Sequence, residues 1–151
     1  MIMKIDEKPD EDYEEVKIEQ LGLLDSMTGI VILQSSTGKQ FHITAFSAEI
    51  AGFIASFMEG KREIPPTIYG MFEQMCEENG LFLVRVKIYE SGGIFRANLY
   101  FTGKKEVILR NYRSSDAIAL ATFYNVPILV RKNLLKEQEA KNPKDDSLPV
   151  K

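Results

Sequence analysis

The chain has 151 residues, of which 44% are hydrophobic and 27% are charged, and its formal net charge at pH 7 is −3. These values are typical of one globular domain. One cysteine (Cys76) and one histidine (His42) exclude an internal disulfide bond and a zinc site built from Cys and His. No stretch is apolar enough to span a membrane and no leader peptide is recognisable, so we expect a cytoplasmic protein without a membrane partner.

The charge is unevenly distributed along the chain. Residues 1–15 contain two lysines and seven acidic residues, whereas residues 81–136 contain ten basic and three acidic residues. An overall acidic protein is not the usual nucleic-acid binder, but the basic half could attract a polyanion such as nucleic acid. Oppositely charged faces that serve self-association are the alternative.

The N-terminal part predicts a tail followed by three strands. Residues 1–15 are acidic and poor in apolar side chains, which is typical of a disordered tail. Alternation in residues 16–24, a continuous apolar run at 30–33 and a third segment at 40–43 predict an antiparallel meander joined by short turns. His42 alternates with apolar neighbours and is expected to face away from the core.

Two helices are predicted next. Ser47 is suited to cap a helix over residues 48–58, in which Glu49 occupies the first turn, where a carboxylate favours the helix dipole. Apolar residues recur at helical spacing in this segment, at positions 50, 53, 54, 57 and 58. Thr67 opens a second helix that contains a buried Cys76 and stops at Asn79-Gly80.

A hairpin follows the second helix. Residues 81–89 and 94–101 are β-rich segments separated by Glu90-Ser91-Gly92-Gly93, which is typical hairpin-turn chemistry. In the first segment, Val84, Val86 and Ile88 alternate with a basic and aromatic set, which we expect on the opposite face of the strand. That set is Arg85, Lys87 and Tyr89.

The last predicted unit is a strand, a tight turn, a helix and a strand. The strand is expected at residues 106–110, and Ser114 and Ser115 could accept hydrogen bonds from the free N–H groups of the helix that follows. Asn125 is suited to stop this helix before a strand at 126–130. The predicted class is α+β: one domain over residues 16–136, with a mostly antiparallel mixed sheet packed by three to four helices and a C-terminal strand–helix–strand unit. Residues 137–151 are expected to form a polar tail.

The segment Arg113-Ser114-Ser115-Asp116-Ala117-Ile118-Ala119-Leu120-Ala121, followed by Val126-Pro127-Ile128, resembles a family signature. In the bifunctional nuclease domain family this signature reads Arg-Pro-Ser-Asp-Ala-Ile-Ala-Leu-Ala and then Ala-Pro-Ile. Glu49 resembles the helix-opening glutamate of that family, Pro65-Pro66-Thr67 its Pro-Leu-Thr, and Ile94-Phe95-Arg96-Ala97 its Thr-Phe-Tyr-Ala strand. The similarity spans residues 16–135 and implies a homo-oligomeric α+β domain with non-specific DNase and RNase activity.

The resemblance also implies a site. Asp116 and Glu49 would be catalytic carboxylates that hold Mg²⁺ or Mn²⁺, and Arg113 would bind the phosphate. Ser115 and Thr67 would be substrate-binding residues beside them. The chain departs from the family at three further positions, because Ile68-Tyr69 stand in place of His-Asp and Asn111 stands in place of Asp.

Two functions from different classes remain open on the sequence. The first is a metal-dependent nuclease that hydrolyses DNA or RNA. The second is a non-catalytic oligomeric module of the same fold, with a binding or regulatory role. In the second case Arg113 and Asp116 would form a salt-bridged turn that holds the helix to the sheet, and Glu49 would be an ordinary first-turn acid.

Overall fold

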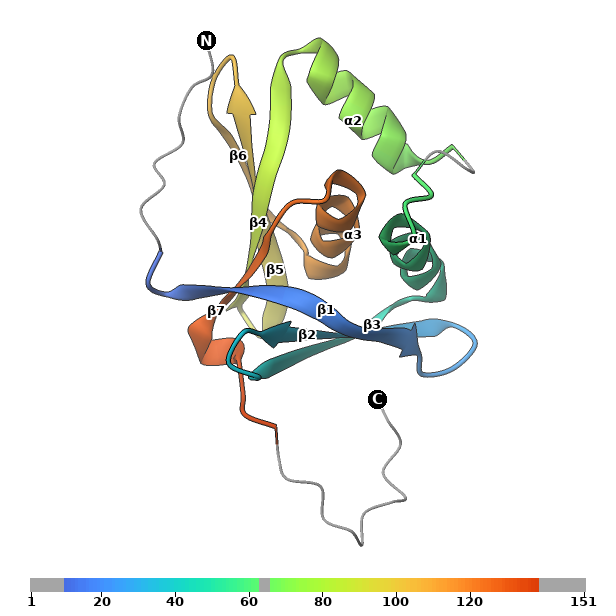
Figure 1. Cartoon of the computed structure of the whole chain (residues 1–151), viewed down its shortest axis with the longest axis vertical. Helices are drawn as coiled ribbons and strands as arrows, with labels where there is room; N and C mark the ends of the chain where they lie inside the picture. The colour runs from blue at the N-terminus through green and yellow to red at the C-terminus, as the bar shows by residue number, and fades with distance from the viewer. Residues whose placement is uncertain (1–9, 63–65, 139–151) are drawn as a thin grey trace, which may run out of the picture.

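The computed structural model describes residues 10–62 and 66–138 (Figure 1). Seven strands form one sheet in the spatial order β3-β2-β1-β7-β4-β5-β6, and three α-helices pack on it. The strands are β1 Tyr13–Leu23, β2 Thr28–Ser35, β3 Gln40–Ser47, β4 Leu81–Ser91, β5 Ile94–Gly103, β6 Val107–Arg113 and β7 Ile128–Arg131. The helices are α1 Ala48–Met58, α2 Ile68–Glu78 and α3 Ser114–Tyr124, followed by a 3-10 turn at Lys132–Leu134. The predicted α+β class is confirmed.

Neighbouring strands pair antiparallel except β4 and β7, which pair in parallel. The meander β1–β2–β3 and the hairpin β4–β5 follow the prediction, and Gly92 and Gly93 supply the positive φ angles (62° and 78°) that a two-residue hairpin turn requires. Helix α3 carries the chain from the edge strand β6 across β5 and β4 to β7. The predicted strand–helix–strand unit is therefore present.

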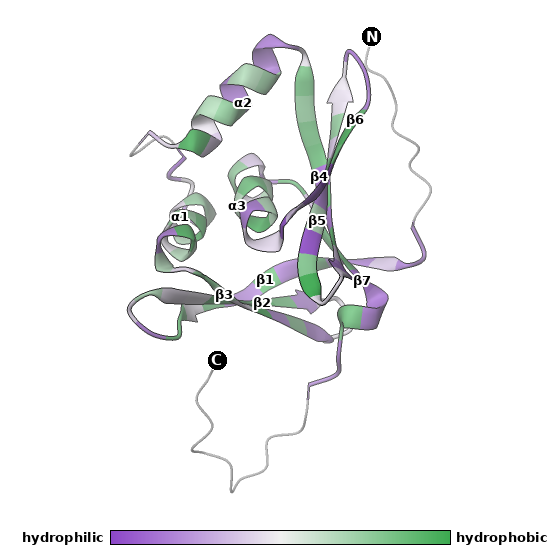
Figure 2. Ribbon diagram, turned by 180° about the vertical axis from the view of Figure 1, so that it is seen from behind, coloured by the Kyte–Doolittle hydropathy of each residue, from purple (hydrophilic) through white to green (hydrophobic). Residues whose placement is uncertain are grey.

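The three helices share one side of the sheet. The sheet bends so that β1–β3 and β4–β6 enclose α1, α2 and α3 between them, and the view from behind shows the same arrangement (Figures 1 and 2). Helix α3 lies deepest, because small and branched residues let it approach the strands closely. Its buried residues include Ala117, Ile118, Ala119 and Ala121.

Aromatic side chains join the helices to one another. The ring of Phe57 in α1 lies 5.3 Å from that of Tyr69 in α2 and 5.0 Å from that of Phe123 in α3, measured between ring centroids. Edge-on contacts of this kind add to the free energy of burying the rings. These contacts join the C-terminal ends of α1 and α3 to the first turn of α2.

None of the helices in the described ranges combines the length and the apolar character that crossing a bilayer requires. The predicted tail needs a correction at its C-terminal end, because β1 begins at Tyr13 and pairs with β7 from Tyr13 onward. Pairing with β7 therefore extends the strand into a segment whose acidic composition suggested a tail. Residues 1–9 and 139–151, which make up most of the two predicted tails, lie outside the described part.

Two predicted core positions were wrong. A β-bulge between Leu83 and Arg85 shifts the alternation in β4, so that Leu83 is buried and Val84 is only half-buried. Met58 is exposed at the C-terminal end of α1, although Ile50, Ile54 and Phe57 are buried as their spacing predicts. The bulge leaves Val86 and Ile88 in the core and their neighbours on the opposite face of the strand.

Candidate functional site

The turn between β6 and α3 positions the signature residues. Arg113 is the N-cap residue of α3, and no side chain caps the helix there. The prediction that Ser114 and Ser115 cap the helix was wrong, because the chain passes directly from β6 into α3 and both serines lie inside the first helical turn. Only 5% of the surface of Ser115 is exposed, so its side chain offers little to a substrate.

Arg113 and Asp116 are joined in a bidentate ion pair. Arg113 Nε donates to Asp116 Oδ2 at 2.8 Å, and Arg113 Nη2 donates to Asp116 Oδ1 at 3.2 Å. The hydrogen bond and the charge of Asp116 raise the pKa of Arg113 above its ordinary value. The two side chains are 71% and 36% exposed, so the pair lies at the surface and is open to an incoming anion.

The charges of this pair and of Glu49 act on the phenol of Tyr69. The Tyr69 side chain is buried, and its pKa is raised to about 12, chiefly by burial; the charges of Asp116 and Glu49 also raise the pKa, whereas that of Arg113 lowers it. The Tyr69 phenol therefore experiences the charges of the three predicted catalytic residues, which lie at the N-terminal ends of α1 and α3. Glu49 is exposed beside the Ser47 cap, where Ser47 Oγ accepts a hydrogen bond from the backbone N–H of Ile50 at 3.2 Å.

Thr67, the other predicted substrate-binding residue, caps α2. Its Oγ1 accepts a hydrogen bond from the backbone N–H of Gly70 at 3.4 Å. Cys76 is buried and its thiol pKa is raised by that burial, which does not favour a thiolate nucleophile. His42 is exposed on β3, as its alternation predicted.

Sequence reasoning missed the part played by Tyr69. In the sequence, Tyr69 was noted only as a departure from the family pattern. The available signal was that a large aromatic side chain occupies the position of a family aspartate. Asn111, another of the three departures, does not join the Arg113–Asp116 pair. Its Oδ1 accepts a hydrogen bond from the Tyr89 hydroxyl, and its backbone oxygen accepts one from Arg96 Nη1 at 3.2 Å.

The carboxylates suit at most one hydrated cation. Within residues 10–62 and 66–138, no group of three or more His, Cys, Asp or Glu side chains is placed to hold a metal ion. Mg²⁺ is commonly bound by one or two carboxylates while it keeps several waters, so Glu49 and Asp116 remain a chemically reasonable donor set for it. A site for two cations would need further ligands.

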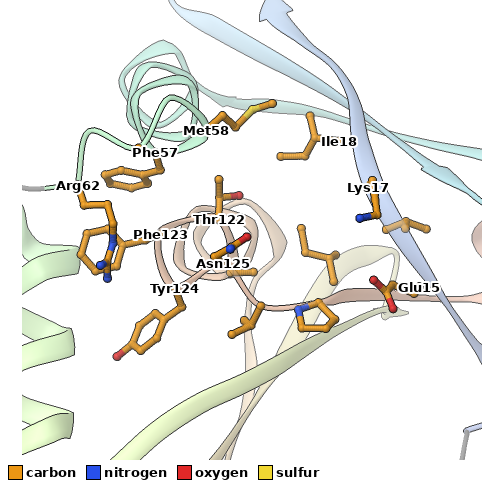
Figure 3. Close-up of a pocket in the computed structure, with 16 residues that line it drawn as sticks. Glu15, Lys17, Ile18, Phe57, Met58, Arg62, Thr122, Phe123, Tyr124 and Asn125 are labelled. Carbon is orange, nitrogen blue, oxygen red and sulfur yellow. The ribbon is translucent and has the colours of Figure 1, made fainter.

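The described part also contains an open groove of ≈ 750 Å³ at the opposite end of α1 and α3 (Figure 3). It is lined by the C-terminal residues of both helices and by β1, and the guanidinium of Arg62 lies 4.2 Å from the ring centroid of Phe123 beside it. None of the five predicted site residues lines this groove. The groove and the Arg113–Asp116 turn are therefore separate features.

Comparison with known families supplies the identity of the fold. A family model described as the bifunctional nuclease domain matches residues 31–143, which is more than half of the chain. The chain belongs to the bifunctional nuclease domain family. A comparison with curated proteins finds no match. In this bifunctional nuclease domain the matched span contains Glu49, Thr67, Arg113, Ser115 and Asp116, together with all three α-helices.

Proposed function

We propose that this bifunctional nuclease domain hydrolyses phosphodiester bonds in DNA or RNA at the N-terminus of α3. The observation that carries the proposal is the exposed, bidentate Arg113–Asp116 pair within the segment that matches the family. A guanidinium that can bind two carboxylate oxygens has the geometry that binds two phosphate oxygens. A polyanionic substrate would compete with Asp116 for Arg113.

Each proposed catalytic residue has a role. Arg113 binds the scissile phosphate and offsets the negative charge that develops on it. Asp116, released from Arg113, and Glu49 hold a divalent cation, Mg²⁺ or Mn²⁺. Such a cation, when bound, lowers the pKa of a water ligand and neutralises phosphate charge. Tyr69 keeps a neutral phenol beside these groups, because its pKa is about 12.

The alternative function is a non-catalytic oligomeric module with a binding or regulatory role. It is favoured by the engagement of both Asp116 oxygens in the ion pair, which is what a purely structural turn would show. Ile68, Tyr69 and Asn111, at positions where the family has His, Asp and Asp, favour it as well. The implied homo-oligomer needs an apolar contact surface, and α2 exposes one at Ile68, Met71 and Met75.

Cleavage of labelled single- and double-stranded DNA and RNA tests the proposal. The protein is assayed with Mg²⁺, with Mn²⁺ and with EDTA, and Asp116→Ala and Arg113→Ala variants are purified in the same way. We expect metal-dependent cleavage by the wild type that both folded variants lose. Equal activity in all three proteins would indicate a contaminating nuclease, and a complete lack of activity would leave the non-catalytic module.

A further inference from the structure

The face of the sheet that points away from the helices carries a mixed set of tyrosines and cations. The set, called the tyrosine–cation face below, consists of Tyr13, Arg85, Lys87, Tyr89, Arg96 and Tyr100. These residues come from the three strands β1, β4 and β5, and no helix of the described chain lies over them (Figure 1). The candidate site includes none of them, and only Arg96 falls in a segment that resembles the family, at a position where the family has Tyr.

The strand register places these side chains together. Arg85 pairs with Tyr100, and Tyr89 pairs with Arg96, in the antiparallel ladder of β4 and β5. Directly opposed residues in such a ladder project from the same face, and successive residues project from opposite faces. Because Val86, Ile88 and Leu99 are buried under the helices, the tyrosines and cations must project outward.

The rings and the cations are already stacked on one another. Arg85 and Lys87 each lie 5.1 Å from the ring centroid of Tyr100, and Lys87 lies 5.0 Å from that of Tyr13. The Tyr89 hydroxyl lies 3.0 Å from Asn98 Oδ1 and shares its one proton between this oxygen and Asn111 Oδ1, which holds this ring in place as well. Pre-ordered side chains lose little conformational entropy when a ligand binds.

The cations of this face are largely free of carboxylates. Lys87 forms an ion pair with Asp10 at 2.7 Å, and the hydrogen bond from Lys87 lowers the pKa of that carboxyl group. In the described ranges, neither Arg85 nor Arg96 forms an ion pair with an acidic side chain. The face therefore has a positive charge that an anionic ligand would complement, and Asp10 occupies one anion position on it.

We propose that the tyrosine–cation face binds single-stranded nucleic acid, with bases stacked on the tyrosine rings and phosphates on the arginines and Lys87. Aromatic rings on an open sheet, with cations between them, match what unpaired bases on a charged backbone offer. A duplex would offer only its phosphates, because its bases are already stacked. Binding at this face does not require cleavage, so the inference goes beyond the proposed nuclease activity.

The face is also continuous with the candidate site. Arg96 pairs with Arg113 across β5 and β6, and Arg113 is the residue that binds Asp116. A strand bound on the tyrosine–cation face could therefore extend around β6 toward the N-terminus of α3. Because of this continuity, the face would hold a strand next to Arg113 whether the site there cleaves the strand or only binds it.

The test is fluorescence anisotropy of a labelled 12-nucleotide oligo(dT) and of a matched hairpin duplex, in EDTA so that cleavage does not interfere. The variants are Tyr100→Leu, Tyr100→Ala and the double variant Arg85→Gln/Arg96→Gln. Lys39→Gln and Lys105→Gln each remove one positive charge from a loop away from the face, at a half-buried and an exposed lysine, and are the controls. Circular dichroism and thermal unfolding of each variant verify that it is folded.

We expect the wild type to prefer the single strand and both tyrosine variants to bind it roughly tenfold more weakly, since one base–aromatic stack accounts for such a factor. The arginine double variant should lower the slope of log affinity against log salt by about 2, whereas each control changes it little. Asp10→Asn, which frees Lys87, should strengthen binding. Equal affinity in folded tyrosine variants, a preference for the duplex, or a lack of binding by the wild type would each overturn the inference.

Failure of the proposed function would look different. Asp116→Asn should abolish cleavage in Mg²⁺ without weakening oligo(dT) binding in EDTA, since it removes a carboxylate that competes for Arg113. If the wild type cleaves nothing but the tyrosine and arginine variants still lose affinity, the nuclease proposal fails and the binding face stands. If cleavage is present but affinity depends on Arg113 and not on the tyrosine–cation face, the reverse holds.

Discussion

The guanidinium of Arg113 binds both carboxylate oxygens of Asp116, which lies three residues further along the chain in the first turn of α3. The pair is exposed, and exposed ion pairs contribute little to stability, because water screens the charges and two side chains lose freedom. Because the ion pair contributes little to folding, Arg113 can exchange the carboxylate of Asp116 for a phosphate at little cost in stability. This is what a phosphate-binding role at Arg113 requires.

Replacing Arg113 should therefore affect cleavage far more than folding. For Arg113→Ala we expect a loss of only about 0.2–1 kcal/mol in the free energy of unfolding. Loss of one donor to the developing phosphate charge should lower the cleavage rate by about 10²-fold. Arg113→Lys keeps the positive charge but lacks the paired N–H donors of the guanidinium, so it should recover part of the cleavage rate. Urea unfolding and single-turnover cleavage of a labelled oligonucleotide measure the two quantities.

The opposite pattern would support the structural alternative. If Arg113→Ala and Asp116→Ala each destabilised the domain by several kcal/mol, the ion pair would be part of the fold at the β6–α3 turn. The double variant distinguishes the cases further, because partners that act only on each other give a double effect no larger than either single effect.

Divalent metal binding should depend on both carboxylates. Titration with Mn²⁺, followed by the electron paramagnetic resonance signal of the free ion, should show weaker binding in Glu49→Gln and in Asp116→Asn than in the wild type. Glu59→Gln, an exposed carboxylate just beyond the C-terminal end of α1, is the control and should bind as the wild type does. Removal of metal with EDTA should abolish cleavage. Mn²⁺ affinity that both variants retain would argue against this donor set.

Tyr69 makes the stability of the domain depend on pH in the alkaline range. Its phenol stays protonated in the folded state up to about pH 12, whereas an exposed tyrosine ionises near pH 10. Above pH 10 the unfolded chain binds fewer protons than the folded one, so stability falls as the pH rises from 10 to 12. Tyr69→Phe should remove this contribution and make the fall less steep. Urea unfolding at pH 8, 10 and 11 measures it.

The exposed Tyr112 provides the control for this experiment. Tyr112→Phe makes the same chemical change at a residue that is 52% exposed, and the slope for Tyr69→Phe is compared with it. A Tyr69→Phe protein with the same alkaline slope as the wild type would contradict the assignment of the raised pKa to Tyr69.

Local signals in the sequence predicted most of the fold. Capping by Ser47, the stop at Asn125 and the Gly92-Gly93 turn depend on neighbouring residues alone, and all three were correct. The errors occurred where the backbone leaves a regular pattern. The bulge before Arg85 shifts the alternation of inward- and outward-facing residues, which in the sequence has a regular period of two. The direct passage from β6 into α3 makes Arg113, and not a serine, the N-cap residue.

The site was harder to predict than the fold. Arg113 and Asp116 are neighbours on one helical turn, so their spacing alone brings them together. Tyr69 and Glu49 come from two other helices, and their shared electrostatic environment depends on how α1, α2 and α3 pack. The tyrosine–cation face was predicted only in part, since alternation placed Arg85, Lys87 and Tyr89 on one side of a strand. The partners from β1 and β5 needed the strand register.

Asn125 should be replaceable by glycine but not by alanine. It ends α3 in the left-handed region, with φ 59° and ψ 52°. Glycine adopts this conformation without strain, whereas a Cβ without a local hydrogen-bonding group makes it unfavourable by about 1 kcal/mol. We therefore expect Asn125→Gly to be close to the wild type and Asn125→Ala to be less stable by about that amount. Urea unfolding of both variants measures the difference, and equal stabilities would contradict it.

The exposed stripe on α2 should determine self-association. Met71 and Met75 are 62% and 63% exposed, and with Ile68 they lie at spacings of three and four residues, which place all three on one side of the helix. Contiguous exposed apolar surface of this kind marks an interaction site. We expect size-exclusion chromatography with light scattering to show an oligomer for the wild type and a smaller species for Met75→Lys. Gln74→Lys introduces the same positive charge at an exposed neighbouring position and should leave the mass unchanged; a wild type that is monomeric at every concentration would contradict the prediction.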